Sequence, residues 1–591
     1  MAPTDHDADV IIIGSGFGGS VAALRFSEAG ERVLVLERGR RVTRDAFQAD
    51  MDAFWRPHKN RYGFNDLRFR GRNLMPWVGA AVGGGSHVYA GTLKRRAELD
   101  GFPEQLRHDG LEIYYDRAEE MLDATPYPDH APYSDVRATE LLFEAGDRMS
   151  DAEDVEDYGA IRLGISFAPP DGTPGETFVN KHGCEQRYYD PREQSLLGGD
   201  IGAKNSLDRN YLFLAEQHGA TIEPLIEADK LEPMDGGGFR VHGLRHRPST
   251  SLWRRFTRAW VPFCGKVEGD AVSYTAKRVV VAAGAVGSTE LLLRNRDVHE
   301  TLPALNDNLG ERYTTNGDFI SFLFPFRGIF VSWLGTIAAI VALCLSNWWL
   351  LGVGVIGYFA GLWVSRRPFD PDIGTTNSDY IRFKGANGKT QSAYIESGRY
   401  PTPTRLFIAI ALSALGRWRP SKYRGVIKFT NAVRKWVPPF AMLARTWPIP
   451  LLKMGDDKAF GVIRLNRKNR AVIDYDVKAN MAFYAELNRF ARRVAKHSRA
   501  FWAPNFFFYA FKILEVPHNQ GGVPMGESSD DGVVDHAGRV FGYDDLMVLD
   551  GSIIPVSTRP NPALTITAVA ERAMETIVDQ MQSGAPIRPP E

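Results

Sequence analysis

The most constraining feature of this chain is a glycine-rich turn between two apolar runs near its N-terminus. The sequence Gly-Ser-Gly-Phe-Gly-Gly at 14–19 follows one apolar run, and a helical stretch and a second apolar run ending at Glu37 come after it. A strand, a glycine turn and a helix in this order form a dinucleotide fingerprint, in which the helix N-terminus binds phosphates. We therefore expect Gly14 to make the tight turn, Gly16 to let the backbone approach a pyrophosphate, and Gly19 to let the helix pack closely on the strand.

The alternative is a chance glycine pattern, since this chain contains 57 glycines. The flanking strand and helix argue against chance, and so does Glu37, whose carboxylate is placed to accept hydrogen bonds from a ribose diol. A second glycine-rich loop at 83–91 would let the backbone approach a flat or anionic group.

Length and composition limit the class of protein. A chain of 591 residues exceeds what one hydrophobic core serves, so two or more domains are expected. The formal net charge of zero does not favour a nucleic-acid partner. Three widely spaced cysteines give neither a disulfide framework nor a zinc motif, and no metal site is expected. The polar, acidic N-terminus does not resemble a secretory signal, so we expect the catalytic part in the cytoplasm.

Residues 328–365 contain no charged side chain and are bounded by arginines on both sides. One helix of this length would span ~57 Å, nearly twice a ~30 Å hydrocarbon core. Two helices of about 17 residues joined at Ser346-Asn347 fit better, and basic residues at both outer ends would keep both ends on the cytoplasmic face. A membrane-embedded or re-entrant hairpin is the preferred interpretation, and a buried core hairpin is the alternative.

The following segment, 397–455, contains no Asp or Glu but eleven Lys and Arg, interleaved with aromatic residues. This composition is typical of helices that lie on an anionic membrane surface. A solvated basic face, or contact with single-stranded nucleic acid, would give the same mixture. The adjacent apolar hairpin favours the membrane.

Two further segments belong with the N-terminal fingerprint. A buried strand at 279–283 runs into Gly284, and near the C-terminus an apolar run ends in Asp550-Gly551. That carboxylate would lie beside a cofactor. A helix starting at about Asn561 would direct its positive N-terminal end to the same place. The nucleotide domain is therefore expected to be assembled from discontinuous pieces.

Together these residues carry a family resemblance. The fingerprint with Glu37, the loop 83–91, the sequence from Ala282 to Leu292, Asn316-Gly317 and the segment 550–572 resemble the glucose–methanol–choline (GMC) family of FAD-dependent oxidoreductases, most closely its cholesterol oxidase branch. The resemblance implies an α/β fold: a Rossmann-like FAD-binding domain with a mixed sheet, at 1–45, 205–315 and 520–585. An α+β substrate-binding domain with an antiparallel sheet would follow at 46–204 and 316–519, with the apolar hairpin inserted in it.

The resemblance also implies a set of FAD contacts without a covalent link to the protein. His87 lies one residue short of the position that His-linked relatives use for a covalent bond. The expected cofactor-binding residues are Gly14, Gly16, Phe17, Gly18, Gly19, Glu37, Gly84, Gly85, Ser86, Gly91, Ala228, Gly284, Asp550, Gly551 and Asn561.

A catalytic His–Asn pair over the flavin is implied at His518 and Asn561, and sterol oxidases add a strand glutamate that corresponds to Glu396. His518 would hold the substrate hydroxyl or accept its proton. Asn561 would orient the substrate or the flavin edge, and a desolvated Glu396 could act as a base that moves a double bond. The structural alternatives are a purely structural His518, an Asn561 that caps its helix, and a Glu396 on the surface.

The expected function is FAD-dependent oxidation of a lipophilic alcohol of the sterol type to a ketone, with or without isomerisation. The expected partners are this alcohol, a membrane lipid surface on the cytoplasmic side of the cell membrane, and O2 or a quinone as electron acceptor. Two alternatives are a quinone-coupled dehydrogenase of another apolar alcohol and a catalytically silent, flavin-fold membrane scaffold. The sequence departs from the sterol oxidases at Asn519-Gln520, where Pro-Leu is usual, and at Ala563, where an aromatic residue is common.

Overall fold

The computed structural model describes most of the chain, in segments separated by short and long gaps. The described residues are 6–42, 54–67, 70–71, 73–134, 137–191, 202–248, 267–325, 349, 352–357, 374–375, 377–385, 392–398, 449–457, 460–505, 508–509, 512–584 and 586–589.

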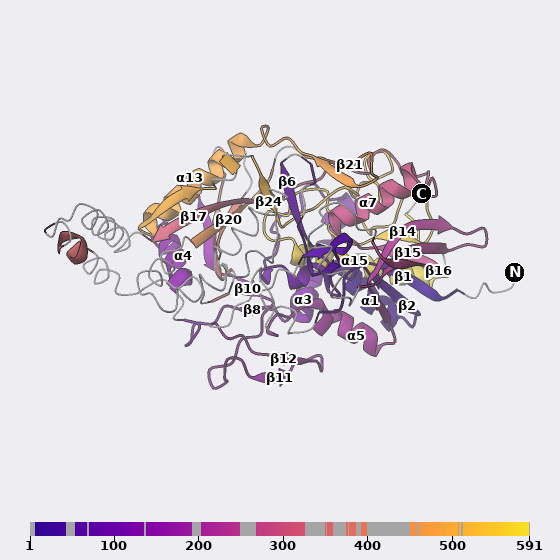
Figure 1. Ribbon diagram of the computed structural model, residues 1–591, viewed down its shortest axis with the longest axis horizontal. Helices are drawn as coiled ribbons and strands as arrows, with labels where there is room; N and C mark the ends of the chain where they lie inside the picture. The colour runs from indigo at the N-terminus through magenta and orange to yellow at the C-terminus, as the bar shows by residue number, and fades with distance from the viewer. Residues whose placement is uncertain are drawn as a thin grey trace.

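A seven-stranded sheet occupies the end of the molecule where both termini lie (Figure 1). Parallel pairing joins β13 (Thr221–Pro224), β2 (Val33–Glu37), β1 (Ala8–Ile13), β16 (Gly269–Val281) and β25 (Leu546–Val548) in that order. The long β16 pairs twice, because its first half is antiparallel to β15 (Phe239–His246), which pairs in turn with β14 (Ile226–Pro233). The sheet is therefore mixed, and its central strands are almost entirely apolar and buried, as expected for a sheet covered on both faces.

Helices from distant parts of the chain cover this sheet. α1 (Phe17–Glu28) packs against α5 (Tyr211–Gln217) and α15 (Ala563–Gln582), and α15 also packs against α3 (Glu112–Met121). Glu571 on α15 joins three of them: its carboxylate accepts a hydrogen bond from Arg25 of α1 at 2.8 Å and from the Tyr211 hydroxyl of α5 at 2.6 Å. The N-terminal and C-terminal segments thus fold into one layered unit.

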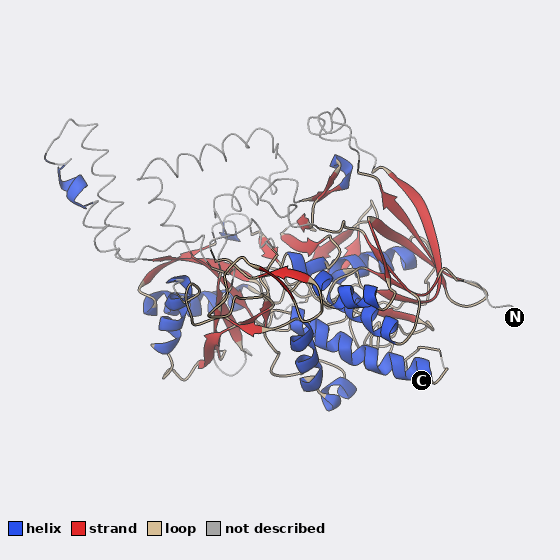
Figure 2. Cartoon of the chain, turned by 90° about the horizontal axis from the view of Figure 1, so that it is seen from below, coloured by secondary structure: helices blue, strands red, loops and turns tan. Residues whose placement is uncertain are grey.

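A six-stranded antiparallel sheet lies at the opposite end of the molecule from the termini (Figures 1 and 2). Its order is β23 (Ala500–Pro504), β17 (Phe319–Pro325), β20 (Ile449–Met454), β19 (Ala393–Ser397), β18 (Asp379–Phe383) and β9 (Val155–Ala160). Helices α13 (Met481–His497) and α4 (Arg137–Asp147) pack on it and on each other. On α13, Phe483, Leu487, Phe490 and Val494 are buried at the three- and four-residue spacing of an amphipathic helix.

A small sheet connects the two ends. β6 (Leu74–Gly79) pairs antiparallel with β5 (Asn65–Leu67) and parallel with β24 (Leu514–Val516), and α7 (Gly284–Asp297) follows β16. The smaller described elements are β3 (Trp55–Arg56), η3 (Pro57–Lys59), β4 (Arg61–Tyr62), η4 (Gly84–His87), β7 (Thr92–Leu93), α2 (Glu104–Asp109), β8 (Thr125–Pro126), β10 (Arg162–Leu163), β11 (Thr177–Val179), β12 (Glu185–Arg187), η6 (Leu207–Arg209), β21 (Val462–Leu465) and β22 (Ala471–Asp474).

The mixed α/β architecture expected from the sequence is confirmed, and the helix expected from about Asn561 begins two residues later, at Ala563. Most of the predicted apolar hairpin, 328–365, and of the basic stretch, 397–455, lies outside the described residues. Among the residues that are described, no helix combines the length and the apolar character needed to cross a membrane.

Candidate active site

One cavity of about 710 Å³ extends from the glycine turn after β1 to the strands of the six-stranded sheet. Its walls combine residues from both ends of the chain. The fingerprint turn, the loop 84–85, the start of α7, Asp550-Gly551 and Asn561 all line it. Because the cavity is continuous, a ligand bound at the glycine turn can reach the His518 and Asn561 side chains.

The fingerprint glycines differ in what surrounds them. A Cβ added to Gly14, whose φ is +101°, would lie 2.3 Å from the Ala282 carbonyl oxygen, and one added to Gly19 would lie 2.2 Å from the Gly14 oxygen. By contrast, a Cβ added to Gly16 would meet no atom within 4 Å among the described residues. Gly14 and Gly19 therefore permit close backbone packing, whereas Gly16 borders open space beside the N-terminus of α1, where a phosphate can be bound.

Two carboxylates shape this part of the cavity. Glu37 accepts hydrogen bonds from the Ser15 hydroxyl at 2.7 Å and from the Gly39 amide at 2.8 Å. Asp550 accepts one from the Gly284 amide at 2.8 Å, and burial raises the pKa of its carboxyl. A carboxylate has about four acceptor positions, so Glu37 keeps capacity for a ribose hydroxyl.

Most of the residues expected to contact the cofactor line the cavity, and Ala228 is one of them. The residues that line it are Gly14, Gly16, Phe17, Gly18, Glu37, Gly84, Gly85, Ala228, Gly284, Asp550, Gly551 and Asn561. Gly19, Ser86 and Gly91 do not. The Ser86 hydroxyl instead donates to the Gly83 oxygen at 2.7 Å, and Gly91 lies against Ile165, so these residues support the loop from behind.

His518 is held by a carboxylate that the sequence analysis did not identify. Its Nδ1 lies 2.7 Å from Oδ1 of Asp318, and its backbone amide donates to the other oxygen of that carboxylate at 3.0 Å. Asp318 is fully buried at the start of β17, so the imidazole is fixed in orientation and Nδ1 carries the proton that it donates. Nε2 is left to face the cavity and Asn561.

Asn561 joins His518 to Glu396. Its Nδ2 lies 3.5 Å from Nε2 of His518 and donates to Oε2 of Glu396 at 3.3 Å, while Asn377 donates to the same Glu396 oxygen at 2.5 Å. Oδ1 of Asn561 is buried without a hydrogen-bond partner among the described residues. The helix cap before α15 is Pro562, so the Asn561 side chain does not serve as that cap.

Glu396 is 1% exposed, which excludes a surface position. It does not line the cavity, because Asn377 and Asn561 stand between it and the open space. The Glu396 carboxylate is therefore linked to the cavity through Asn561. The predicted role of Glu396 as a base would require direct contact with the substrate.

Burial and neighbouring charges shift the pKa values of Glu396, Asp318 and His518. Burial raises the pKa of Glu396 to about 7, against the smaller lowering effects of His518, Asn561 and Asn377. Burial also raises the pKa of Asp318, despite its contacts with His518. For His518 burial alone would lower the pKa, but the adjacent Asp318 carboxylate, followed by Glu396, raises it above the ordinary value. His518 is thus a stronger base than a free histidine.

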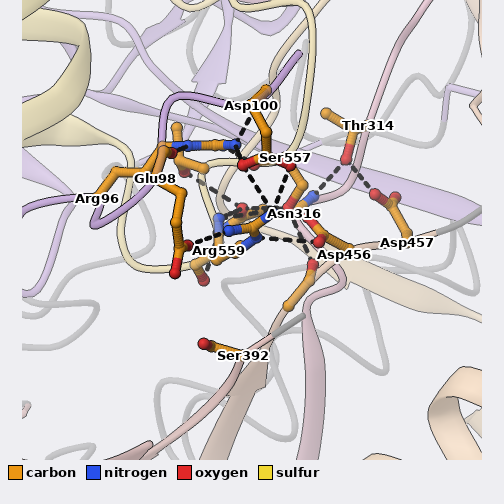
Figure 3. A network of polar contacts seen from close by, with 12 residues as sticks. Arg96, Glu98, Asp100, Thr314, Asn316, Ser392, Asp456, Asp457, Ser557 and Arg559 are labelled. Atoms are coloured by element: carbon orange, nitrogen blue, oxygen red, sulfur yellow. Dashed lines mark hydrogen bonds and ion pairs between the residues drawn. The ribbon is translucent and has the colours of Figure 1, made fainter. Parts of the chain in front are cut away.

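A polar network holds the loop that carries Asn561 (Figure 3). Oδ1 of Asn316 accepts from the Arg559 amide at 2.9 Å and from the Ser557 hydroxyl at 2.8 Å, and its Nδ2 donates to the Pro560 oxygen at 3.1 Å. Asn316 lies two residues before Asp318, so one tripeptide positions both the loop of Asn561 and the imidazole of His518.

The same loop is fixed from its other side by the Arg559 side chain. Figure 3 shows its guanidinium surrounded by three carboxylates: it donates to Asp456 at 2.9 Å and to Asp100 at 2.8 Å, and it pairs with Glu98. Arg559 has a positive φ of 71°, so these contacts hold a backbone conformation that a non-glycine residue seldom adopts.

Comparisons with known proteins agree with this arrangement. A family model described as GMC oxidoreductase matches residues 457–570, and one described as FAD binding domain matches residues 9–69. A cholesterol oxidase from Acinetobacter baumannii is 26% identical, with 98% of this chain and 95% of that protein covered. One from Mycobacterium tuberculosis is 29% identical, over 96% of this chain and 90% of that protein. The chain resembles the GMC oxidoreductase family.

A solved structure described as pyridoxine 4-oxidase from Mesorbium loti shares the fold, with a TM-score of 0.54 and 16% identity over 96% of this chain and 99% of that one. The two family matches and the cholesterol oxidase relatives show that the protein is an FAD-dependent oxidoreductase that acts on an alcohol. The cavity fits this cofactor: the open space at Gly16 lies beside a helix N-terminus that can bind a pyrophosphate, and Glu37 retains an acceptor position for a ribose. Within the described residues, no group of three or more His, Cys, Asp or Glu could hold a metal ion.

Sequence reasoning found His518, Asn561 and Glu396 but missed Asp318 and Asn377. A signal for Asp318 was present, since it directly follows the Asn316-Gly317 motif. No comparable signal marks Asn377, which reaches Glu396 from the segment before β18.

Proposed function

We propose that this FAD-dependent oxidoreductase oxidises the hydroxyl of a lipophilic alcohol of the sterol type to a ketone. The observation that carries the proposal is the Asn561 amide, which contacts both Nε2 of His518 and Oε2 of Glu396 at one cavity. The two full-length cholesterol oxidase relatives support a sterol-like substrate. So do the apolar side chains that β17 and β20 present to the cavity, such as Ile320, Phe322 and Leu452.

FAD, held along Gly16 and Glu37, would supply the hydride acceptor for this oxidation. The protein supplies the proton acceptor. Because Nδ1 of His518 donates to Asp318, the neutral imidazole offers Nε2 to the hydroxyl proton, and the Asp318 carboxylate stabilises the imidazolium that forms. The hydroxyl proton thus moves to Nε2, the carbon loses a hydride, and the carbonyl bond forms. Asn561 lines the cavity beside Nε2 of His518 and can orient the substrate.

Glu396 acts in this proposal as a positioning residue. Its carboxylate accepts from Asn377 and Asn561, which fixes the amide against His518. Isomerisation of a double bond would require the carboxylate to reach the substrate past Asn561, so the present arrangement favours oxidation over isomerisation.

The test is anaerobic mixing of the FAD-loaded protein with cholesterol, long-chain alcohols and aryl alcohols. Cholesterol should abolish the absorbance of the oxidised flavin in the parent protein. In His518→Ala the absorbance of the oxidised flavin should persist. Bleaching by aryl or short alcohols alone would replace the sterol proposal with another alcohol. If no alcohol bleaches the flavin and the variant behaves as the parent does, the catalytically silent scaffold is favoured.

The electron acceptor is O2 or a quinone. Release of hydrogen peroxide when the reduced protein meets air would identify an oxidase. Reoxidation by a soluble quinone analogue without peroxide would identify a dehydrogenase.

We also propose attachment to the cytoplasmic side of the cell membrane through 328–365 and the basic segment 397–455. The proposal rests on their composition and on the described residues within the first segment, where Trp349 is 90% and Ile356 70% exposed. A membrane surface would cover such side chains. Deleting 328–365 should release the protein from the membrane pellet while FAD binding persists. Retention of the deleted form in the pellet would contradict the anchoring role.

A further inference from the structure

Glu515 is a carboxylate in the wall of the cavity that has no partner among the described residues. It lies at the centre of β24, between the buried residues Leu514 and Val516. Glu515 lines the cavity together with Val516 and with Met75, its register partner on β6.

The other carboxylates that line this cavity all have partners. Their partners include Ser15 and Gly39 for Glu37, Arg38 for Asp66, His246 for Glu227, Ala471 and Arg70 for Glu290, and Gly284 and Ser288 for Asp550. Glu515 makes no hydrogen bond or ion pair with any residue that the structure describes.

The carboxyl of Glu515 has a shifted pKa. Burial raises the pKa of its carboxyl to about 7, and no neighbouring charged group contributes to this value. Glu515 is half-buried in the cavity wall. A carboxylate there that has no partner among the described residues keeps its acceptor positions open to a ligand in the cavity.

The position of Glu515 relative to the reacting groups limits what that ligand can be. Glu515 lies three positions before His518, so the two Cα atoms are at most about 11 Å apart. Both side chains line one cavity, so a single substrate can contact both. A hydroxyl at His518 and a second polar group at Glu515 would then belong to the same molecule.

We propose that Glu515 determines substrate specificity by accepting a hydrogen bond from a second donor group, a hydroxyl or an amine, on the lipophilic alcohol. The inference rests on the proposed function and narrows it: the substrate is an apolar skeleton with two polar ends, one oxidised at His518 and the other bound by Glu515. A plain sterol satisfies only the first of these contacts.

The test compares matched substrates on the FAD-loaded protein. They are a steroid with hydroxyls on its A and D rings, the same steroid without the D-ring hydroxyl, and the analogue with a D-ring amine. The parent protein should prefer the diol or the amino alcohol to the mono-ol in kcat/KM. Glu515→Gln should reduce that preference by about 10- to 100-fold, the loss expected for a hydrogen bond to a charged group. If the diol loses more of its kcat/KM preference, the donor is a hydroxyl. If the amino alcohol loses more, the donor is an ammonium.

Met75→Leu is the matched control, because it changes the shape of the same wall without changing charge. It should leave the preference as in the parent. An equal preference in the parent and in Glu515→Gln would overturn the inference. So would a changed FAD affinity or flavin spectrum in Glu515→Gln with the preference intact, since Glu515 would then contact the cofactor. Failure of all three steroids to bleach the parent flavin would instead count against the proposed function.

Discussion

Replacing Asp318 with asparagine is the sharpest test of how His518 works. Asparagine preserves the size of the side chain and an oxygen that can accept from the His518 amide, but it removes the charge 2.7 Å from Nδ1. A hydrogen bond to a charged group contributes about 1.5–3 kcal/mol. If the imidazolium loses this stabilisation in the transition state, kcat/KM on the plateau of the pH profile should fall by about 10- to 150-fold.

The pH dependence should change in a defined direction. The pKa of His518 is raised by Asp318, and the proton acceptor is the neutral imidazole, so activity in the parent is lost as the pH falls through this raised value. In Asp318→Asn the pKa of His518 is lower, so the neutral imidazole persists to lower pH. The acid limb of the kcat/KM profile therefore moves to lower pH. Rapid-mixing measurements of anaerobic flavin reduction between pH 5 and 9, about 2 units either side of neutrality, would record both changes.

Asp457→Asn provides the matched control. Asp457 is also buried, but it binds Thr314, Thr315 and Tyr475 rather than the imidazole. It should leave the acid limb where it is in the parent. An Asp318→Asn protein that binds FAD normally, with an unmoved or more alkaline acid limb, would refute the reasoning.

Four further substitutions test other parts of the site. Glu396→Gln should slow flavin reduction while FAD remains bound, because the amides of Asn377 and Asn561 lose their charged acceptor. Unchanged oxidation with accumulation of an unconjugated ketone would instead show that Glu396 acts directly as a base. Asn316→Ala should lower kcat more than it raises KM. It should also reduce the free energy of unfolding by about 1–3 kcal/mol, because it leaves groups of the loop unpaired. Denaturant unfolding of the FAD-loaded protein would measure this loss. Gly16→Ala should give folded protein with weakened FAD binding, whereas Gly19→Ala, with its Cβ 2.2 Å from the Gly14 oxygen, should unfold at lower temperature. Equal thermal stability of these two glycine variants would contradict the packing argument.

The parts of the fold that the sequence predicts well are those specified by local rules. The turn after β1 requires glycines at fixed positions, because backbone atoms approach where a Cβ would lie, as at Gly14 and Gly19. The apolar runs at 10–13 and 33–36 have the length and composition of buried parallel strands. These constraints involve neighbours in sequence, so they can be recognised without a structure.

Contacts between distant segments are harder to predict. Asp318 and His518 are 200 residues apart, and no spacing rule relates them. Glu396 was recognised through its motif, but its separation from the cavity depends on Asn377, which only the folded sheet places there. Glu515 could have been noticed as the charged residue between Leu514 and Val516, an alternation typical of a strand. That it faces a ligand cavity rather than solvent depends on the pairing with β6.

The parallel pairing of β1 with β16 has a consequence for how the protein is made. Ala8 pairs with Ala276, so the edge of the first strand that does not pair with β2 waits for its partner until the ribosome has added a further 268 residues. At ~5–20 residues per second this takes roughly 15 to 50 seconds. β25 and α15, which complete the layer around the flavin, emerge only at the end of synthesis. During that interval the apolar first strand needs protection, which makes it a natural binding site for chaperones on the nascent chain.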